Sequence, residues 1–461
     1  MGAFDIFYAR LPVWAQHVAV SIYGVYWRQL RFGAGYTHFV DQYKKREYWT
    51  IDQWQVWQSE QLRHMLSACV QQVPFYREQW NSAEKQAALR GELSPVPLLE
   101  KDPIRADPKA FLRQDMKPFH PQTFLTSGST GTPISSYYTL PELRQSLALR
   151  EVRSAGWAGV SFRKPRATFS GRMVEPAPAS RGPYYRFNAA ERQVYFSPFH
   201  LRPDTARQYV HALNRHRIEW ATGYAVSYYL LARFMLEKGI APPQYLKAII
   251  TTSEKLTSDM RAVMEQAYGC RIYEEYSTVE NVIFASECEH GRLHISPDVS
   301  VVEILRPDGS ACQPGEAGEV VVTSLSKTYQ PLIRFRLGDA AMWDAHPCPC
   351  GRHMPVLKEV VGRMEDVVIG PDGRQMVRFH GVFVNQPHVI EGQIIQEALN
   401  LIRVKIVPAI GFGVSDMDDI THRIQQRLGD SVRVIVEPVQ NISRTKAGKF
   451  KAVISRIRLD G

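Results

Sequence analysis

The sequence predicts an α/β protein with a large, multi-layered N-terminal domain and a small α+β domain at its C-terminal end. Its 461 residues exceed what one ordinary hydrophobic core contains. Helix-period and strand-period patterns alternate beyond about residue 60, as in layered α/β domains. Near residue 365 the pattern changes to a turn-rich hairpin followed by a compact module. We therefore expect a helical extension over residues 1–60, a core over 61–365 and a small domain over 366–461.

The first predicted helix, within residues 11–30, is rich in Trp, Tyr and Val, and Arg28 follows the aromatic pair Tyr26 and Trp27. Such a helix could lie in a membrane interface or pack on its own domain. Its polar face is not strongly cationic, whereas interfacial helices usually are. We expect a packed helix, with peripheral membrane association as the alternative.

The next segment, residues 50–80, shows a clear helical period. Leu62, Met65, Leu66 and Val70 fall on one face. Pro74 ends this helix, because proline cannot continue the backbone hydrogen bonds. The Pro-rich residues 95–108 then predict a connection without regular structure.

Further along the chain, each predicted strand is followed by a polar loop. Two helices around a short strand are expected in 204–239, strand–loop patterns in 245–256 and 270–281, and paired strands in 318–326 and 332–343. In α/β sheets, ligands bind at loops leaving the carboxyl ends of strands. Beyond residue 366, the segments 378–409, 416–430 and 431–443 predict a βαβ-like module.

Composition narrows the possible partners and compartment. The net charge of +10 favours anionic partners, but the basic residues are scattered and form no helix-length Arg/Lys stripe, so we expect no nucleic-acid partner. Six cysteines in so long a chain do not make a disulfide framework. The sequence also lacks a window of about 18 uncharged apolar residues and a cationic leader. These features predict a cytoplasmic protein.

The stretch TSGSTGTP, residues 126–133, combines glycines with hydroxyl side chains. Glycines let backbone N–H groups approach an anion closely, and hydroxyls add donors without bulk. The stretch therefore predicts a loop that grips phosphate, with an ordinary Ser/Thr/Gly turn as the alternative. It is not a Walker loop, because the GK[ST] sequence is missing.

Six motifs occur in a fixed order: TSGSTGTP (126–133), TTSEKL (251–256), YSTVE (276–280), RFRLGD (334–339), GRMED (362–366) and TKAGKFK (445–451). This series resembles the adenylate-forming superfamily of acyl-CoA synthetases, peptide-synthetase adenylation domains and luciferases. With CPCGR (348–352), it is most similar to the phenylacetate-CoA ligase and coenzyme F390 synthetase branch. The opening segment and IIQEALNLIRVKIV (394–407) resemble the subgroup encoded in capsular and exopolysaccharide loci.

The resemblance implies that the large domain is an adenylation domain and that the small C-terminal domain is mobile. The implied reaction joins a small carboxylic acid to ATP, giving an acyl-adenylate and pyrophosphate, after which a nucleophile displaces AMP. Position 132 carries Thr132 where the family often has Lys, which removes some neutralising charge. The residues implied to grip the β- and γ-phosphates are Thr126, Ser127, Gly128, Ser129, Thr130 and Gly131.

The YSTVE and TTSEKL motifs supply further implied roles. Glu280 matches the acidic Mg²⁺-associated position, Thr278 would offer its hydroxyl to the α-phosphate, and Tyr276 would stack on adenine. Ser277 replaces the glycine that the family usually has there. The acid pocket and the adenine edge would be lined by Thr251, Ser253 and Glu254, and Tyr224 and Tyr228 would either shape the pocket or belong to the core.

Four later residues complete the implied site. Asp339 would accept both ribose hydroxyls, with an exposed turn aspartate as the alternative, and Arg363 would reach the same region. Glu365 occupies the hinge position, where the family more often has Asp. Lys449 would stabilise charge developing during adenylation, with a solvated basic tail as the alternative, because Lys446 and Lys451 lie close by in the sequence.

Three thiols and an imidazole, from Cys288, His294, Cys348 and Cys350, suit a tetrahedral structural zinc site. The spacings differ from a standard zinc ribbon, but family members with CPCG also tend to carry the corresponding histidine. His290 is the competing fourth ligand. The other cysteines, Cys69, Cys270 and Cys312, are expected to be isolated.

Three functions are compatible with these residues. The first transfers the activated acyl group to coenzyme A, in capsular or exopolysaccharide biosynthesis. The second transfers it to an amine of a sugar or amino acid. The third is an inactive scaffold at a polysaccharide assembly site, against which the presence of Glu280, Asp339, Arg363 and Lys449 argues. The expected cofactors are ATP, Mg²⁺, coenzyme A and a structural Zn²⁺.

Overall fold

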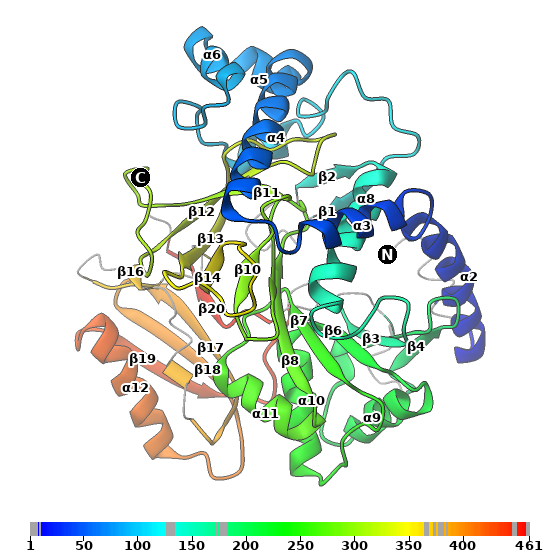
Figure 1. Ribbon diagram of the computed structural model, residues 1–461. Helices are drawn as coiled ribbons and strands as arrows, with labels where there is room; N and C mark the ends of the chain where they lie inside the picture. The colour runs from blue at the N-terminus through cyan, green and yellow to red at the C-terminus, as the bar shows by residue number, and fades with distance from the viewer. Residues whose placement is uncertain are drawn as a thin grey trace.

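The computed structural model describes residues 8, 11–125, 134–170, 174, 182–363, 368–371, 375–376, 382–383, 386–444 and 450–457. Within them the chain forms a large α/β domain around one extended sheet and a smaller C-terminal domain with its own sheet (Figure 1). The predicted fold class is confirmed.

The large domain is organised around a twelve-stranded sheet with the order β11-β12-β13-β14-β10-β9-β8-β7-β6-β3-β5-β4. Strands β5, β3, β6, β7 and β8 run parallel, and the remaining pairings are antiparallel. The strand bounds are β3 Arg166–Phe169, β4 Tyr185–Asn188, β5 Gln193–Phe196, β6 Trp220–Tyr224, β7 Ala248–Thr252, β8 Arg271–Ser277, β9 Phe284–Glu287, β10 Leu293–Ile295, β11 Ser300–Leu305, β12 Ala317–Ser324, β13 Phe335–Trp343 and β14 Val356–Arg363.

Helices follow the parallel strands where the sequence predicts them. The segment 204–239 forms α9 (Ala206–Arg215), β6 and α10 (Ala225–Glu237), and β7 leads to α11 (Ser258–Tyr268). Buried side chains of these three helices form one apolar cluster with β3, β5 and β6. The parallel half of the sheet is thereby fixed in place, and its strand ends position the loops of the candidate site.

A second apolar cluster holds the antiparallel half of the sheet against α4 (Ile51–Gln72). Met65 and Leu66 of α4 are buried there, as the helical period predicts, and Pro74 opens the next helix, α5 (Pro74–Gln79). The remaining elements of this part are α6 (Ser82–Arg90), α7 (Lys101–Ala106), α8 (Leu140–Arg150), a π-helical turn (Glu151–Ala155), a 3₁₀ turn (Pro198–His200) and a hairpin of β1 (Gln122–Leu125) and β2 (Ser135–Tyr138).

The N-terminal helices wrap around the large domain. Helix α2 (Val13–Arg31) packs along the edge strand β4, and α3 (Tyr36–Arg46) packs on α8. The expected packed helix is therefore present, although one face of α2 remains exposed. Among the described residues, none of the helices is both long and apolar enough to cross a bilayer.

The C-terminal domain contains the predicted βαβ module. Strands β18 (Leu401–Pro408) and β19 (Arg433–Pro438) pair in parallel and are connected by α12 (Val414–Leu428). Strands β17 (Val389–Ala398) and β20 (Val453–Ser455) complete a sheet of order β19-β18-β17-β20, and β15 (Val368–Ile369) pairs with β16 (Gln375–Met376) in the predicted hairpin. Ile402, Ile420 and Ile424 belong to the separate apolar cluster of this domain.

Candidate nucleotide and acyl site

The candidate site begins where β6, β7 and β8 end. These strands run parallel, so their carboxyl ends and the loops that follow lie at the same edge of the sheet. In the loop after β7, Ser253 has a φ of +71°, and after β8 Asn281 has a φ of +54°. Such left-handed backbone is uncommon for residues other than glycine and is often found at functional sites.

Glu254 connects the two domains at this edge. Its carboxylate accepts the Val226 N–H at the start of α10 at 2.9 Å and the Phe450 N–H of the C-terminal domain at 2.8 Å. An anionic group is favourable at a helix N-terminus because the backbone N–H groups there are unpaired. The C-terminal segment that begins at Phe450, directly after Lys449 in the sequence, thus contacts the core at the predicted adenine edge.

Tyr276 and Asp339 meet across the site. The Tyr276 hydroxyl, at the end of β8, donates to the Asp339 Oδ2 atom of β13 at 2.7 Å. Asp339 is 5% exposed and is paired in register with Arg363 on β14, so the alternative of an exposed turn aspartate is wrong. The sequence motifs YSTVE and RLGD are brought together here although they are separated by many residues and several strands.

Thr278 and Glu280 lie in the loop that follows β8. The Oγ1 atom of Thr278 is buried and has no hydrogen-bond partner among the described residues. A buried hydroxyl without a partner costs free energy, so such a group suits a position where a ligand supplies the missing hydrogen bond. Glu280 is 9% exposed. Ser277 points its hydroxyl to the Glu275 carboxylate at 3.1 Å.

Lys327 is a buried residue near this site that the sequence analysis missed. Its ammonium donates to the Ser136 hydroxyl at 2.6 Å and the Tyr137 carbonyl at 3.1 Å, and it lies 3.7 Å from the centre of the Tyr138 ring. Burial lowers the pKa of Lys327 to about 7, while Glu142 and Glu280 act in the opposite direction. The sequence signal for this residue is a lone lysine directly after the predicted strand 318–326.

Several predicted residues lie outside the described part of the chain. These are Thr126, Ser127, Gly128, Ser129, Thr130, Gly131, Thr132, Glu365, Lys446 and Lys449, together with the side chain of Arg363. Strands β1 and β2 flank residues 126–133 and pair with each other, with Leu125 of β1 opposite Ser135 of β2.

The two tyrosines weighed as pocket residues belong to the core. Tyr228 is fully buried, donates its hydroxyl to the Thr222 carbonyl at 3.0 Å and packs edge-on against Phe169. Tyr224 is 7% exposed and belongs to the same apolar cluster. Thr251 is also buried and donates to the Tyr273 carbonyl at 3.0 Å. These contacts assign all three side chains to the packing of the sheet.

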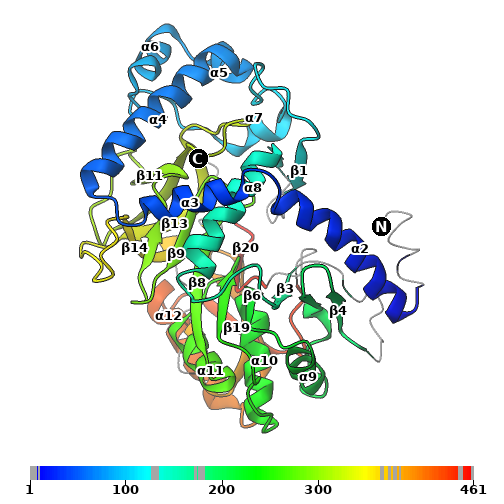
Figure 2. The same ribbon diagram turned by 45° about the vertical axis from the view of Figure 1, so that its right-hand side comes forward.

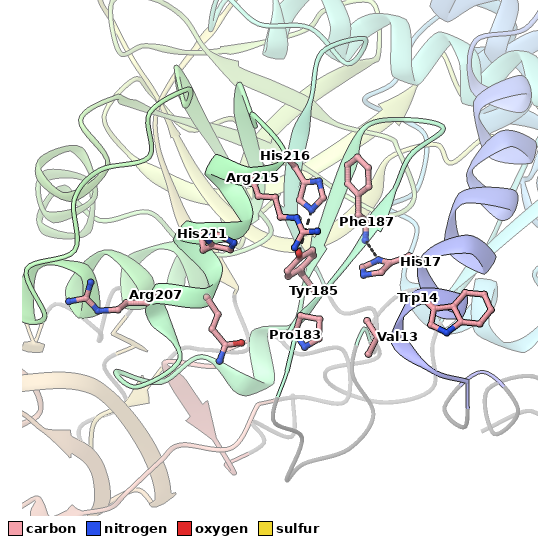
Figure 3. Close-up of a pocket in the computed structure, with 11 residues that line it drawn as sticks. Val13, Trp14, His17, Pro183, Tyr185, Phe187, Arg207, His211, Arg215 and His216 are labelled. Carbon is pink, nitrogen blue, oxygen red and sulfur yellow. Dashed lines mark hydrogen bonds between the residues drawn. The ribbon is translucent and has the colours of Figure 1, made fainter.

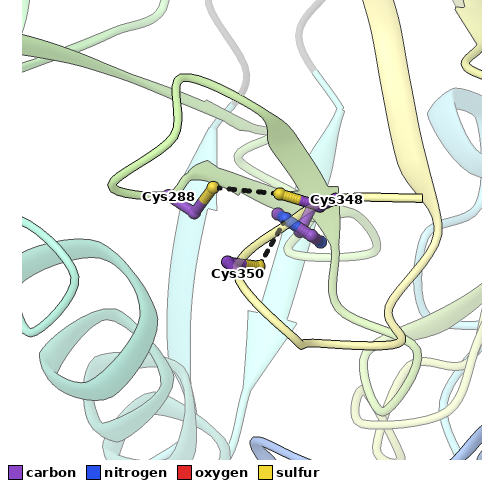
Figure 4. Close-up of side chains that lie close together, drawn as sticks. Cys288, Cys348 and Cys350 are labelled. Atoms are coloured by element: carbon purple, nitrogen blue, oxygen red, sulfur yellow. Dashed lines mark hydrogen bonds between the residues drawn. The ribbon is translucent and has the colours of Figure 1, made fainter. Parts of the chain in front are cut away.

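The four predicted metal ligands converge (Figure 4). The ligand atoms of Cys288, His294, Cys348 and Cys350 all lie within 4.8 Å of one another, with 3.6 Å between the sulfurs of Cys288 and Cys348. Zn–S bonds of about 2.3 Å in a tetrahedron place two sulfurs about 3.8 Å apart, so the set fits zinc. All six cysteines are free of disulfides.

His294 rather than His290 completes the described cluster. The Nε2 atom of His294 lies 3.4 Å from the Cys350 sulfur, and its Nδ1 atom lies 3.2 Å from the Met354 carbonyl. That carbonyl favours a proton on Nδ1 and leaves Nε2 free to bind a metal. Burial lowers the pKa of His294 to about 4, which keeps the imidazole neutral at neutral pH.

Comparisons with known proteins agree with this arrangement. Residues 369–456 match the family model of the CapK C-terminal domain. The chain is 23% identical over 464 residues to Protein CapK of Staphylococcus aureus, covering 98% of this chain and 99% of that protein. It is 25% identical over 340 residues to phenylacetate-coenzyme A ligase of Thermus thermophilus, covering 68% of this chain and 71% of that protein.

The fold is also found among solved structures. The structure of 2-hydroxyisobutyryl-CoA ligase in the postadenylation state, in complex with R3-HIB-AMP, superposes with a TM-score of 0.70 at 20% identity and covers 89% of this chain and 91% of that one. The overall fold is thus shared with that ligase. Residues 369–456 match the CapK C-terminal domain, and the similarities to Protein CapK and to phenylacetate-coenzyme A ligase support a chain of the adenylate-forming, CapK-like type.

Proposed function

We propose that this protein is an AMP-forming acid ligase that activates a carboxylic acid with ATP and transfers the acyl group to coenzyme A. The observation that carries the proposal is the contact between Glu254 of the core and the Phe450 N–H of the C-terminal domain. It brings the segment directly after Lys449 to the loop that contains Ser253, at the same sheet edge where β8 ends and the Thr278 loop begins. A cation delivered to that edge would stabilise charge developing at an α-phosphate.

In the first half-reaction, a carboxylate oxygen of the acid attacks the α-phosphorus of ATP, and the bond to pyrophosphate breaks. We assign the ribose hydroxyls to Asp339, the α-phosphate to the unpartnered hydroxyl of Thr278, and the β- and γ-phosphates to residues 126–131. Glu280 would hold Mg²⁺, whose chemical contribution is to neutralise phosphate charge. Lys449 would act on the oxygens of the bond being made.

In the second half-reaction, the sulfur of coenzyme A attacks the acyl carbonyl carbon and AMP leaves with the electron pair of the broken bond. Two curated relatives, from Thermus thermophilus and Aromatoleum evansii, are phenylacetate-coenzyme A ligases, which favours coenzyme A over an amine acceptor. The four-residue Cys/His cluster would hold a structural zinc ion and take no part in either step.

The first test is acid-dependent exchange of labelled pyrophosphate into ATP with a panel of carboxylic acids. Lys449→Ala should lower exchange about 100- to 1000-fold, the usual loss when one preorganised charged donor is removed. The matched control is Lys446→Ala, which removes the same charge from the same segment. Equal exchange in the Lys449→Ala variant and the parent protein would contradict the assignment.

Thr278→Val tests the contribution of the core to the same step. We expect a fall in exchange of about 10-fold or more with little change in thermal stability, because the hydroxyl makes no hydrogen bond within the described residues and its loss leaves packing volume unchanged. Ser277→Ala is the control, since the Ser277 hydroxyl points to Glu275. A stability loss equal for both variants, with unchanged exchange, would argue for a structural role of Thr278.

The acceptor is tested by AMP release with coenzyme A or with amines added. Faster turnover with coenzyme A supports the proposal, whereas exchange that only amines convert to turnover supports an amide-forming ligase. No exchange with any acid would favour an inactive scaffold. We place the reaction in capsular or exopolysaccharide biosynthesis, and Lys449→Ala at the native locus should then lower surface polysaccharide while Lys446→Ala does not.

A further inference from the structure

Helix α2 exposes an apolar face to the outside of the molecule. Trp14 is 71% exposed and Ile22 67%, and the face is continued by Val18, Val25 and Tyr26, each 50% exposed. These positions recur at the spacing of one helical face. A helix on the surface of a globular protein ordinarily turns such a face inward. We refer to Trp14, Val18, Ile22, Val25 and Tyr26 as the α2 face.

A side of α2 next to this face packs on the edge strand β4 through specific polar contacts. The His17 Nδ1 atom accepts the Phe187 N–H at 2.9 Å, Ser21 accepts the Ala189 N–H at 3.0 Å, and Arg28 donates to the Ala190 carbonyl at 3.0 Å. Gly24 lies so close to Asn188 that a Cβ atom would come within 2.1 Å of its side chain. The orientation of the helix is therefore fixed by specific contacts, with its apolar side outward.

A cationic row on α9 lies across β4 from the first turns of α2 (Figure 3). Arg207, His211 and Arg215 follow one another at four-residue spacing on the exposed side of α9 and line a cavity of about 740 Å³ together with Trp14 and His17. None of the 11 lining residues is acidic, and α2 contains no acidic residue either. Arg215 makes no ion pair with the part of the chain that the structure describes.

The positive charge of this cavity at neutral pH comes from its arginines. Burial and the neighbouring Arg215 lower the pKa of His216 to about 4, and burial together with Arg186 and Arg215 lowers that of His17. Both imidazoles are therefore neutral. Arg207 donates to the Lys238 carbonyl at 3.2 Å, and neither arginine forms an ion pair with another described residue. Two such guanidinium groups beside an aromatic and aliphatic face match a surface that is anionic outside and apolar beneath.

We propose that the α2 face and the cationic row of α9 form a peripheral docking surface for an anionic lipid bilayer. The α2 face would lie among headgroups and upper acyl chains, where tryptophan and tyrosine are favoured. Arg207 and Arg215 would meet lipid phosphates at the cavity. In both overall views, α2 lies on the opposite side of the molecule from α12 of the C-terminal domain (Figures 1 and 2). Docking would leave that domain facing away from the membrane.

A second copy of the chain is a poorer occupant of the same surface. A two-fold dimer uses the same patch on both subunits. It would set the arginine row of each copy against a patch that carries no acidic residue along α2 or the cavity. An anionic bilayer offers both an apolar phase and the opposite charge, so charge complementarity selects it.

The test is co-sedimentation of the full-length protein with vesicles of phosphatidylcholine alone or of phosphatidylcholine with phosphatidylglycerol. We expect binding to the anionic vesicles, weakened by salt. Arg215→Gln should weaken binding about fivefold, because one basic residue near an anionic surface contributes about 1 kcal/mol. The double variant Val18→Ser/Ile22→Ser should abolish binding, and Trp14→Phe should remove the blue shift of tryptophan fluorescence on vesicle addition.

The controls are Ile410→Ser/Val414→Ser, two exposed apolar residues of the C-terminal domain, and Arg433→Gln, an exposed arginine of β19. These should bind vesicles like the parent protein. The proposal is overturned if the parent protein ignores anionic vesicles at low salt, or if controls and test variants lose binding equally. It is also overturned if the parent protein is a dimer in solution that Val18→Ser/Ile22→Ser converts to a monomer, since a second copy then covers the α2 face.

Discussion

At the scale of single residues, Lys327 is the charged group whose burial is most unusual near the candidate site. It is 1% exposed and is held by Ser136 and Tyr137 of β2, the strand that follows the hydroxyl-rich stretch 126–133. The acidic groups that act on it are Glu142, which caps α8, and Glu280, the predicted Mg²⁺-associated residue. The ammonium of Lys327 is hydrogen-bonded close to the stretch 126–133, and its charge interacts with Glu280 in the loop after β8.

The burial of Lys327 makes stability depend on pH in a defined direction. Its pKa is about 7 in the folded protein and near 10.5 in the unfolded chain, so between these values only the unfolded state binds the proton. The free energy of unfolding therefore rises with pH in that window, by at most about 1.4 kcal/mol per pH unit.

We expect the difference in free energy of unfolding between the parent protein and Lys327→Met to grow from about pH 7 to about pH 9. Urea denaturation at a series of pH values measures this difference. The exposed Lys358→Met is the control and should show a flat difference. Parallel curves for the parent protein and Lys327→Met would mean that Lys327 stays charged in the fold.

At the scale of elements, the Cys/His cluster joins the turn between β9 and β10 to the CPCGR loop that precedes β14. The cluster packs against Trp54 of α4 and Trp157, so it also fixes the N-terminal helices on the antiparallel half of the sheet. A metal bound by these four residues would hold the CPCGR loop in place in addition to the hydrogen bonds of the loop itself. We expect this element to contribute to stability and not to take part in the predicted nucleotide site.

We expect about one zinc ion per chain in protein purified without chelator, and near none in Cys350→Ser. The variant should unfold at a lower temperature, because three remaining ligands bind the metal more weakly. Elemental analysis and thermal unfolding measure both effects, and Cys270→Ser is the control outside the cluster. A metal content that is unchanged in Cys350→Ser would show that a different ligand set binds the ion.

At the scale of the whole molecule, the described residues of the two domains meet through a small set of contacts. Besides the Glu254–Phe450 hydrogen bond, Arg233 of α10 donates to the Val389 carbonyl at 3.4 Å, and Ile390 packs against the apolar cluster of the large domain. The core of the C-terminal domain is otherwise its own. A unit with its own core and few contacts to the rest can move as a body.

A chain shortened to residues 1–365 should therefore stay folded and cooperative but lose pyrophosphate exchange. Circular dichroism and thermal unfolding measure folding, and the exchange assay measures activity. The full-length Lys449→Ala variant is the control, because it should lose exchange while the whole chain stays folded. Exchange by the shortened chain at the parent rate would contradict a role for the C-terminal domain in adenylation.

The sequence by itself determined the elements and the chemically distinctive clusters. Local periodicity predicts α4, the α9–β6–α10 unit and the βαβ module, and the rarity of cysteine and histidine identifies Cys288, His294, Cys348 and Cys350. Such features depend on neighbours along the chain, or on residue types with few other uses, so they can be read without three-dimensional information.

The tertiary structure alone decided which of these features meet. The contact of Glu254 with Phe450 spans 196 positions and that of Lys327 with Ser136 spans 191, distances over which no local pattern carries information. The exposure of the α2 face was likewise not readable, because an apolar helical stripe has the same sequence whether it faces a core or the outside. The tertiary packing determines which side of α2 faces outward, because His17 and Ser21 accept backbone N–H groups of Phe187 in β4 and of Ala189 just after it.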